Sequence, residues 1–140
     1  MGVARATTVT AAAVMTSPVI CVDAATSLTS LWHLLQRLHL NAVVVSEGRI
    51  PLGIVDRRDI WATWASDLHV GAVGTARHVV SPTPCVSLET PLPLVCSALL
   101  SAHHEIVMVL DAGGHLRGIV TAADALHVLP APTEPEAPLC

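Results

Sequence analysis

The feature that most constrains the fold is an internal repeat at a spacing of 64 to 65 residues. The segment 17–22 (SPVICV) matches 81–86 (SPTPCV), and 53–59 (GIVDRRD) matches 118–124 (GIVTAAD). The one-residue difference in spacing is absorbed by a longer turn before the second match. Two copies of one unit therefore account for most of the chain. A unit of about 60 residues makes only a marginal core alone, so we expect the two copies to pack together.

Each copy has the same order of predicted elements: strand, helix, strand, strand, helix. Helical spacing relates Leu28, Leu31, Leu35 and Leu38 in the first copy, and Leu92, Val95, Leu99 and Ala102 in the second. Apolar runs at 42–45 and 52–55 predict two strands, as do 106–110 and 116–120. We predict an α+β fold of two layers (α/β two-layer), a pseudo-symmetric pair of β-α-β-β-α repeats packed sheet to sheet.

The repeat also sets the expected boundaries. Residues 1–13 form an N-terminal extension, 14–65 the first repeat, 66–78 a linker and 79–129 the second repeat. The Pro-rich residues 130–140 are expected to be a disordered tail.

Composition excludes several classes of function. The net charge is −4 and all seven basic residues are Arg, so we expect no binding to nucleic acid, which requires clustered positive charge. No apolar run reaches the roughly 18 residues of a membrane span. The four cysteines are widely spaced, which indicates free thiols and a cytoplasmic protein. We expect Cys21 and Cys85 to be small core residues.

The segment 118–124 fits a pattern of glycine, two apolar residues, Ser or Thr, two further residues and Asp, at a strand-to-helix junction. The Thr121 hydroxyl and the free N–H groups of the following helix suit a phosphate. Asp124, one turn on, can accept the paired hydroxyls of a ribose. A Thr followed by Asp three residues later is also an ordinary helix N-cap. Both interpretations stay open.

The first copy has Asp56 where the second has Thr121, and Asp59 where the second has Asp124. A carboxylate about 4 Å from a phosphate would be repelled by roughly 4 kcal/mol at an effective dielectric near 20. Asp56 is equally well explained as a helix N-cap. Arg57 and Arg58 either contact a phosphate or form a solvated start of the helix.

The duplicated motif, opened by Val14-Met15-Thr16-Ser17-Pro18, resembles a tandem pair of CBS domains (the cystathionine β-synthase type), also called a Bateman module. The resemblance spans about residues 14–129. It implies a regulatory module and not an enzyme. Such modules bind AMP, ADP, ATP, S-adenosylmethionine, sometimes NAD or cyclic dinucleotides, and often form homodimers.

The resemblance also implies two pockets in the cleft between the repeats. In one, Thr121 and Asp124 take phosphate and ribose, and the adenine wall is Ser17, Val19, Leu40, Asn41 and Ala42. In the other, Asp59 takes the ribose, beside Asp56 and opposite Ser81, Thr83, Glu105 and Ile106. The chain has no Phe or Tyr, so an adenine would lie between aliphatic side chains. We expect the Thr121 pocket to be competent and the other to prefer a less anionic ligand or to be empty.

Two further groups of residues have simpler explanations. His103 and His104 are expected at the C-terminal end of a helix, and no metal site is predicted. Trp61 and Trp64 lie on one helix face and either fill the core or form a dimer interface with Leu126 and Leu129.

The sequence thus predicts a small sensor of an adenosine-containing ligand, with no required cofactor, that signals to an unknown effector protein. The alternative is a structural or dimerisation protein of the same fold that has lost the ligand.

Overall fold

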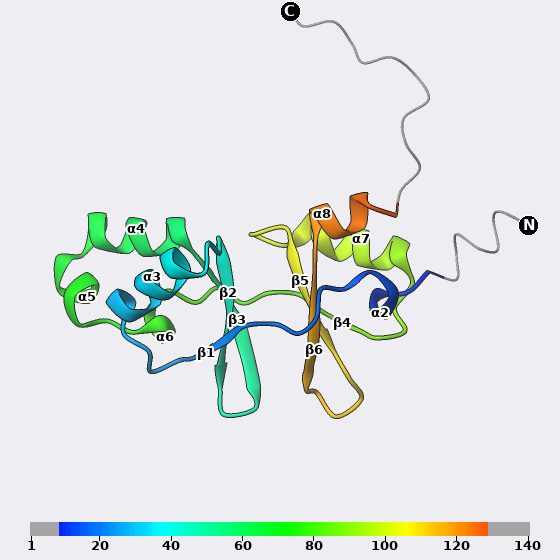
Figure 1. Cartoon of the computed structure of the whole chain (residues 1–140), viewed down its shortest axis with the longest axis horizontal. Helices are drawn as coiled ribbons and strands as arrows, with labels where there is room; N and C mark the ends of the chain where they lie inside the picture. Colours follow the sequence, from blue (N-terminus) through cyan, green and yellow to red (C-terminus); the bar gives the residue numbers. More distant parts are fainter. Residues whose placement is uncertain (1–8, 129–140) are drawn as a thin grey trace, which may run out of the picture.

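The computed structural model describes residues 9–128. The Pro-rich tail, most of the predicted N-terminal extension and Leu129 lie outside these residues. Figure 1 shows two lobes with their strands at the centre and their helices outward. The elements, in chain order, are α2 (Ala11–Val14), β1 (Cys21–Asp23), α3 (Leu28–Arg37), β2 (Ala42–Glu47), β3 (Ile50–Asp56), α4 (Arg57–Ser66), α5 (Leu68–Val73), α6 (Ala76–Val79), β4 (Cys85–Ser87), α7 (Leu92–Ser101), β5 (Ile106–Leu110), β6 (Leu116–Thr121) and α8 (Ala122–Leu126).

The strands form two sheets of identical topology. In the first sheet, β1 pairs parallel with β2, and β2 pairs antiparallel with β3. In the second, β4, β5 and β6 repeat this arrangement. Val44 and Ile54 of the first sheet pack against Ile106 and Met108 of the second in one buried cluster. The predicted pair of β-α-β-β-α repeats packed sheet to sheet is therefore confirmed.

The outer face of each sheet is covered by an amphipathic helix. The predicted apolar stripe of α3 is buried through Leu28, Leu31 and Leu35, but Leu38 is 42% exposed because the helix ends at Arg37. On α7, Leu92, Val95 and Leu99 are buried in the second core. Burying one such leucine is worth about 1.5–3 kcal/mol, so these two stripes are a main source of stability.

Each repeat is completed by the short helix that precedes the other one. Ahead of the first repeat, α2 packs on the second core, and the Ala11 N–H donates to the Thr90 carbonyl at 2.9 Å. Ahead of the second repeat, α6 packs on the first core, and the Ala76 N–H donates to the Thr26 carbonyl at 2.8 Å. The segment expected as a linker, 66–78, accordingly contains α5 and most of α6.

The glycine of each duplicated motif lies where the leading segment of the other repeat crosses the sheet. A Cβ on Gly53, whose φ is +155°, would lie 2.0 Å from the Ser81 carbonyl oxygen. A Cβ on Gly118 would lie 2.8 Å from the Thr16 carbonyl oxygen. In both places two backbone hydrogen bonds join the crossing segments, between Ile54 and Ser81 and between Ile119 and Thr16. Glycine is therefore required here for close backbone approach.

The three tryptophans form one cluster on α3 and α4. Trp32 lies 5.1 Å from Trp61 and 6.0 Å from Trp64, measured between ring centroids, and both pairs meet edge to face. Trp64 packs against the first core and donates its indole N–H to the Gly71 carbonyl at 2.8 Å, whereas Trp61 is 54% exposed. Trp64 thus belongs to the core, and Trp61 leaves apolar surface in solvent.

Cys21 and Cys85 occupy matching positions in β1 and β4, but both are exposed, so their assignment to the core is wrong. Each lies at the first position of a short outer strand, facing away from the buried Val22 and its partly buried counterpart Val86. Partial burial still raises the pKa of both thiols above the ordinary value. Among the helices of residues 9–128, none is both long enough and apolar enough to cross a lipid bilayer.

Candidate functional site

A pocket of about 150 Å³ opens between the two sheets, and its lining is mostly aliphatic. An apolar cavity of about this size accepts a benzene-sized ring. The lining residues, which come from both repeats, are Thr16, Pro18, Val19, Ile20, Leu40, Ala42, Val43, Val44, Ile54, Ile106 and Ile119. Three residues of the predicted adenine wall are among them: Val19, Leu40 and Ala42.

A polar hollow adjoins this apolar pocket, because Ala42, Ile106 and Ile119 line both. The other residues of the hollow are Asn41, His104, Glu105, Thr121, Ala122 and Ala123. Together the two spaces are called the Thr121 pocket below. One end of it is apolar and the other presents hydroxyl, amide and carboxylate groups.

Asp124 is not itself a lining residue of either part, but it is hydrogen-bonded to one lining residue of each. The Thr16 hydroxyl, which lines the apolar part, donates to the carboxylate of Asp124 and lies 3.0 Å from each of its oxygens. The same carboxylate accepts the Thr121 N–H at 2.9 Å, and the Thr121 hydroxyl accepts the Asp124 N–H at 3.1 Å. This reciprocal pair is a capping box at the start of α8.

Thr16 was not among the predicted site residues, and Ser17 was predicted in its place. Ser17 is exposed and lines neither part of the Thr121 pocket. The Ser-Pro pairs suggest that Ser17 matches Ser81, but the bridging residues in the structure are Thr16 and Ser81. The second repeat has one residue fewer between this bridge and its first strand. Thr16 therefore matches Ser81 at a spacing of 65 residues, the same spacing that relates segments 53–59 and 118–124.

Glu105 was expected in the Asp59 pocket, but it lines the polar part of the Thr121 pocket. Its φ is +55°, and its carbonyl accepts the Ala122 N–H at 3.1 Å. Ile106 likewise lines the Thr121 pocket. Asn41 lies at the polar end and not along the apolar wall. Among the described residues, no Arg lines this pocket, so its polar end carries a negative side chain and no permanent positive one.

The Asp59 pocket has a different character. Its lining residues are Asp56, Arg58, Asp59, Ala62 and His103. Asp56 and Asp59 form a capping box at the start of α4, in which the Asp59 N–H donates to Asp56 at 2.8 Å and the Asp56 N–H donates to Asp59 at 3.0 Å. The capping interpretation is therefore correct in both copies of the motif.

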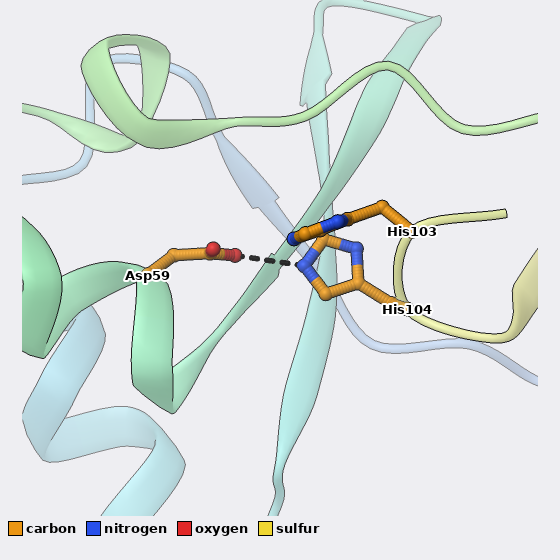
Figure 2. Close-up of side chains that lie close together, drawn as sticks. All are labelled: Asp59, His103 and His104. Carbon is orange, nitrogen blue, oxygen red and sulfur yellow. Dashed lines mark hydrogen bonds and ion pairs between the residues drawn. The ribbon is translucent and has the colours of Figure 1, made fainter.

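His104 is the counterpart of Leu40 in the second repeat. It lines the polar part of the Thr121 pocket and reaches across to Asp59 of the other pocket. Leu40 and His104 each follow their helix by three positions, after Arg37 and after Ser101. The His104 side chain is 5% exposed, and its Nε2 lies 2.9 Å from Asp59 Oδ2 and 3.4 Å from Asp56 Oδ2 (Figure 2). The expectation that His103 and His104 end a helix is wrong, since α7 ends at Ser101 and both lie in the loop before β5.

The other residues predicted for the Asp59 pocket do not lie beside Asp59. Ser81 pairs with Ile54 through the backbone, and the Thr83 hydroxyl donates to the Ser81 carbonyl at 3.2 Å. Arg57 turns away from the cleft: its guanidinium lies 5.1 Å from the Trp32 ring centroid and donates to Gln36. Of the two neighbouring arginines, Arg58 alone lines the Asp59 pocket.

Comparison with known proteins identifies the architecture. The CBS domain model matches residues 11–60 and 76–131. The chain is similar to Hypoxic Response Protein I in its structure with two coordinated zinc ions, at a TM-score of 0.78 and 21% identity over 86% of this chain and 99% of that one. It is also similar to CBSX2 from Arabidopsis thaliana, at a TM-score of 0.73 and 21% identity over 84% and 92% of the two chains. CBSX2 in complex with AMP gives a TM-score of 0.70 at 23% identity, over 84% and 93%.

The chain is also similar in sequence to the A-adding tRNA nucleotidyltransferase of Geobacter sulfurreducens, with 28% identity over 120 residues. The match covers 86% of this chain but spans only 13% of that protein's length. CBS-pair proteins are generally regulatory modules rather than enzymes. Since the family model covers both repeats and more than half of the sequence, the chain belongs to the CBS domain family.

Proposed function

We propose that this protein is a regulatory module that binds an adenosine-containing ligand in the Thr121 pocket and signals to a partner protein. The observation that carries the proposal is an aliphatic slot lined in part by Thr16 that continues into a polar hollow lined by Thr121, with Asp124 hydrogen-bonded to both threonines. A purine would lie in the slot, and Asp124 would accept the ribose hydroxyls, sharing its carboxylate with Thr16. The complex of CBSX2 with AMP supports this ligand class.

The polar end favours ligands with little negative charge. It offers a phosphate the Thr121 hydroxyl and His104, while Glu105 adds a repulsive carboxylate. We therefore expect AMP and S-adenosylmethionine to bind more tightly than ATP. For binding to become a signal, the ligand must favour one arrangement of the protein over another.

Calorimetric titration of AMP, S-adenosylmethionine and ATP into the wild type, Asp124→Ala and Asp59→Ala tests the assignment. Asp124→Ala is expected to weaken binding more than about tenfold, since it removes a charged acceptor worth about 1.5–3 kcal/mol. Asp59→Ala is expected to leave the affinity almost unchanged. Each variant loses one capping box, so urea unfolding of both shows whether their folding losses match.

Two results would contradict the proposal. An equal loss of affinity in both variants would remove the distinction between the pockets. Failure of the wild type to bind any of the three ligands would favour the alternative, a structural CBS protein without a ligand. A thermal-shift assay provides the check on that second result, because a ligand at a hundredfold its Kd adds about 2.7 kcal/mol to stability.

We also propose that two copies associate through α4 and α8. Trp61 on α4 is 54% exposed and Leu126 on α8 is 65% exposed, and the two helices lie on the same side of the molecule (Figure 1). Sedimentation equilibrium is expected to show a dimer that Trp61→Asp dissociates, whereas Leu68→Asp, at a residue 82% exposed on α5, leaves it intact. A monomeric wild type, or a dimer unchanged by Trp61→Asp, would overturn this assignment.

A further inference from the structure

A cluster of three side chains lies at the Asp59 pocket, and of these only His104 also lines the Thr121 pocket. Asp59, His103 and His104 each offer one ligand atom, and the three atoms all lie within 4.8 Å of one another. Figure 2 shows Asp59 projecting from α4 toward the two imidazole rings on the loop before β5. The rings stand at 82° to each other with centroids 4.6 Å apart, so two neighbouring histidines face one space.

The hydrogen-bond pattern of this cluster leaves a demand for positive charge. The His104 Nε2 carries at most one hydrogen, yet two carboxylate oxygens converge on it, from Asp59 at 2.9 Å and from Asp56 at 3.4 Å. Both carboxylates are partly withdrawn from water, with side chains 25% exposed for Asp56 and 18% for Asp59. Arg58 supplies one positive charge at the rim. Two carboxylates and one arginine leave one negative charge that no permanent positive charge in the cluster balances.

We propose that Asp59, His103 and His104 bind a divalent transition-metal ion of the zinc class. Imidazole and carboxylate ligands suit Zn²⁺, Co²⁺ or Ni²⁺, whereas Mg²⁺ and Ca²⁺ take sets made of oxygen alone. A tetrahedral ion with bonds of about 2.0–2.1 Å places its ligand atoms about 3.4 Å apart. The ligand atoms now lie up to 4.8 Å apart, and the exposed side chain of His103 can rotate to shorten its distances to the other two.

The fold already orients two of the three ligands. The backbone N–H of Asp56 holds Asp59 Oδ2 at 3.0 Å, which fixes that carboxylate as a supporting hydrogen bond does in known metal sites. His104 is almost fully buried against the opposite repeat. Three protein ligands leave a fourth position for water or for Asp56. Because Asp59 belongs to the first repeat and both histidines to the second, the ion would join the repeats.

Competition between the full-length chain, freed of metal by a chelator, and a chromophoric zinc indicator tests the proposal. The wild type is expected to bind one Zn²⁺ ion that His103→Ala and Asp59→Asn each weaken more than about tenfold, since even the loss of a supporting hydrogen bond costs about 10–100-fold. His33→Ala, at an exposed histidine of α3, is the matched control and is expected to bind like the wild type. His103 is exposed, so its variant keeps the folding of the protein intact.

The exposed thiols of Cys21 and Cys85 are the competing ligands, and Co²⁺ distinguishes them. Bound by imidazole and carboxylate, Co²⁺ gives visible d–d bands without the thiolate-to-metal charge-transfer band in the near ultraviolet. A charge-transfer band from the tight site, or a Zn²⁺ affinity equal in His103→Ala and the wild type, would overturn the proposal. Neither readout involves a nucleotide, and the two substituted ligands, Asp59 and His103, do not line the Thr121 pocket, so this result is separate from the test of the adenosine site.

Discussion

The two pockets of this protein are built on the same repeated motif, but their side chains differ, most notably at two positions. Thr121 and Leu40 in one pocket stand where Asp56 and His104 stand in the other. Leu40 lines an open aliphatic slot, whereas His104 lies 2.9 Å from the Asp59 carboxylate. Matching backbone positions thus carry side chains of different chemistry in the two repeats.

The largest expected difference between the repeats concerns their crossing glycines. Gly53→Ala is expected to lower the free energy of unfolding by about 3 kcal/mol, because the new Cβ meets backbone at 2.0 Å and the φ is +155°. Gly118→Ala is expected to cost less, since its Cβ meets backbone only at 2.8 Å, at the Thr16 carbonyl oxygen, and its other close contacts are to the flexible Met15 side chain. Urea unfolding of both variants measures the difference. A greater loss for Gly118→Ala would contradict it.

Exchanging the side chains that distinguish the pockets is the next test. Leu40→His is expected to weaken AMP binding about 10–100-fold, because it fills the slot with a polar ring and removes the fit of an apolar pocket. Titration calorimetry measures the loss, and Leu38→His, at the exposed end of α3, is the control. An undiminished affinity would show that the purine does not use this slot.

The reverse exchange, His104→Leu, is expected to open the Asp59 pocket to a second equivalent of AMP. It also removes the pairing of a nearly buried imidazole with two carboxylates, so the free energy of unfolding is expected to fall by about 1–3 kcal/mol. If binding stays at one equivalent, Asp56 rather than His104 closes the pocket. The double variant His104→Leu with Asp56→Thr then tests whether both side chains must change before a second equivalent binds.

The smallest effect is expected in the hairpin turns, which also differ between the repeats. Hydrogen bonds from the His115 and Gly113 backbone N–H groups, together with nearby positive charge, hold the pKa of Asp111 below its usual value. The ionised Asp111 therefore stabilises the fold above its ordinary pKa, and this contribution is lost as pH falls through the lowered value. Asp111→Asn is expected to flatten the decline in stability as the pH falls below the ordinary pKa of an aspartate. Urea midpoints that fall in parallel for both proteins would refute it.

Much of this architecture could be predicted from the sequence because it depends on local periodicity. The stripes of α3 and α7, and the caps at Asp56 and Thr121, are set by residues within one or two turns. The packing of α2 on the second core and of α6 on the first could not be predicted in this way. It depends on contacts such as Ala11 to Thr90, far apart in the chain, which no local pattern records.

The candidate site was harder to predict for the same reason. Val19, Leu40 and Ala42 follow from their place in the repeat, but Thr16 was displaced by a one-residue shift in the alignment of the copies. His104 was misplaced because its role depends on Asp59, 45 residues earlier, and on a helix that ends sooner than its apolar pattern. Contacts between the repeats can be located only once the three-dimensional packing of the two repeats is known.

The exchanged leading helices have a consequence for how the chain is made. Thr16 leaves the ribosome early, but its partner Ile119 is among the last residues of the fold to appear. At about 5–20 residues per second, the N-terminal segment waits roughly 5 to 20 s for its place on β6. The first repeat, by contrast, is complete as soon as α6 emerges. Synthesis therefore proceeds from a finished first lobe to a second lobe that closes on a segment made before the first lobe.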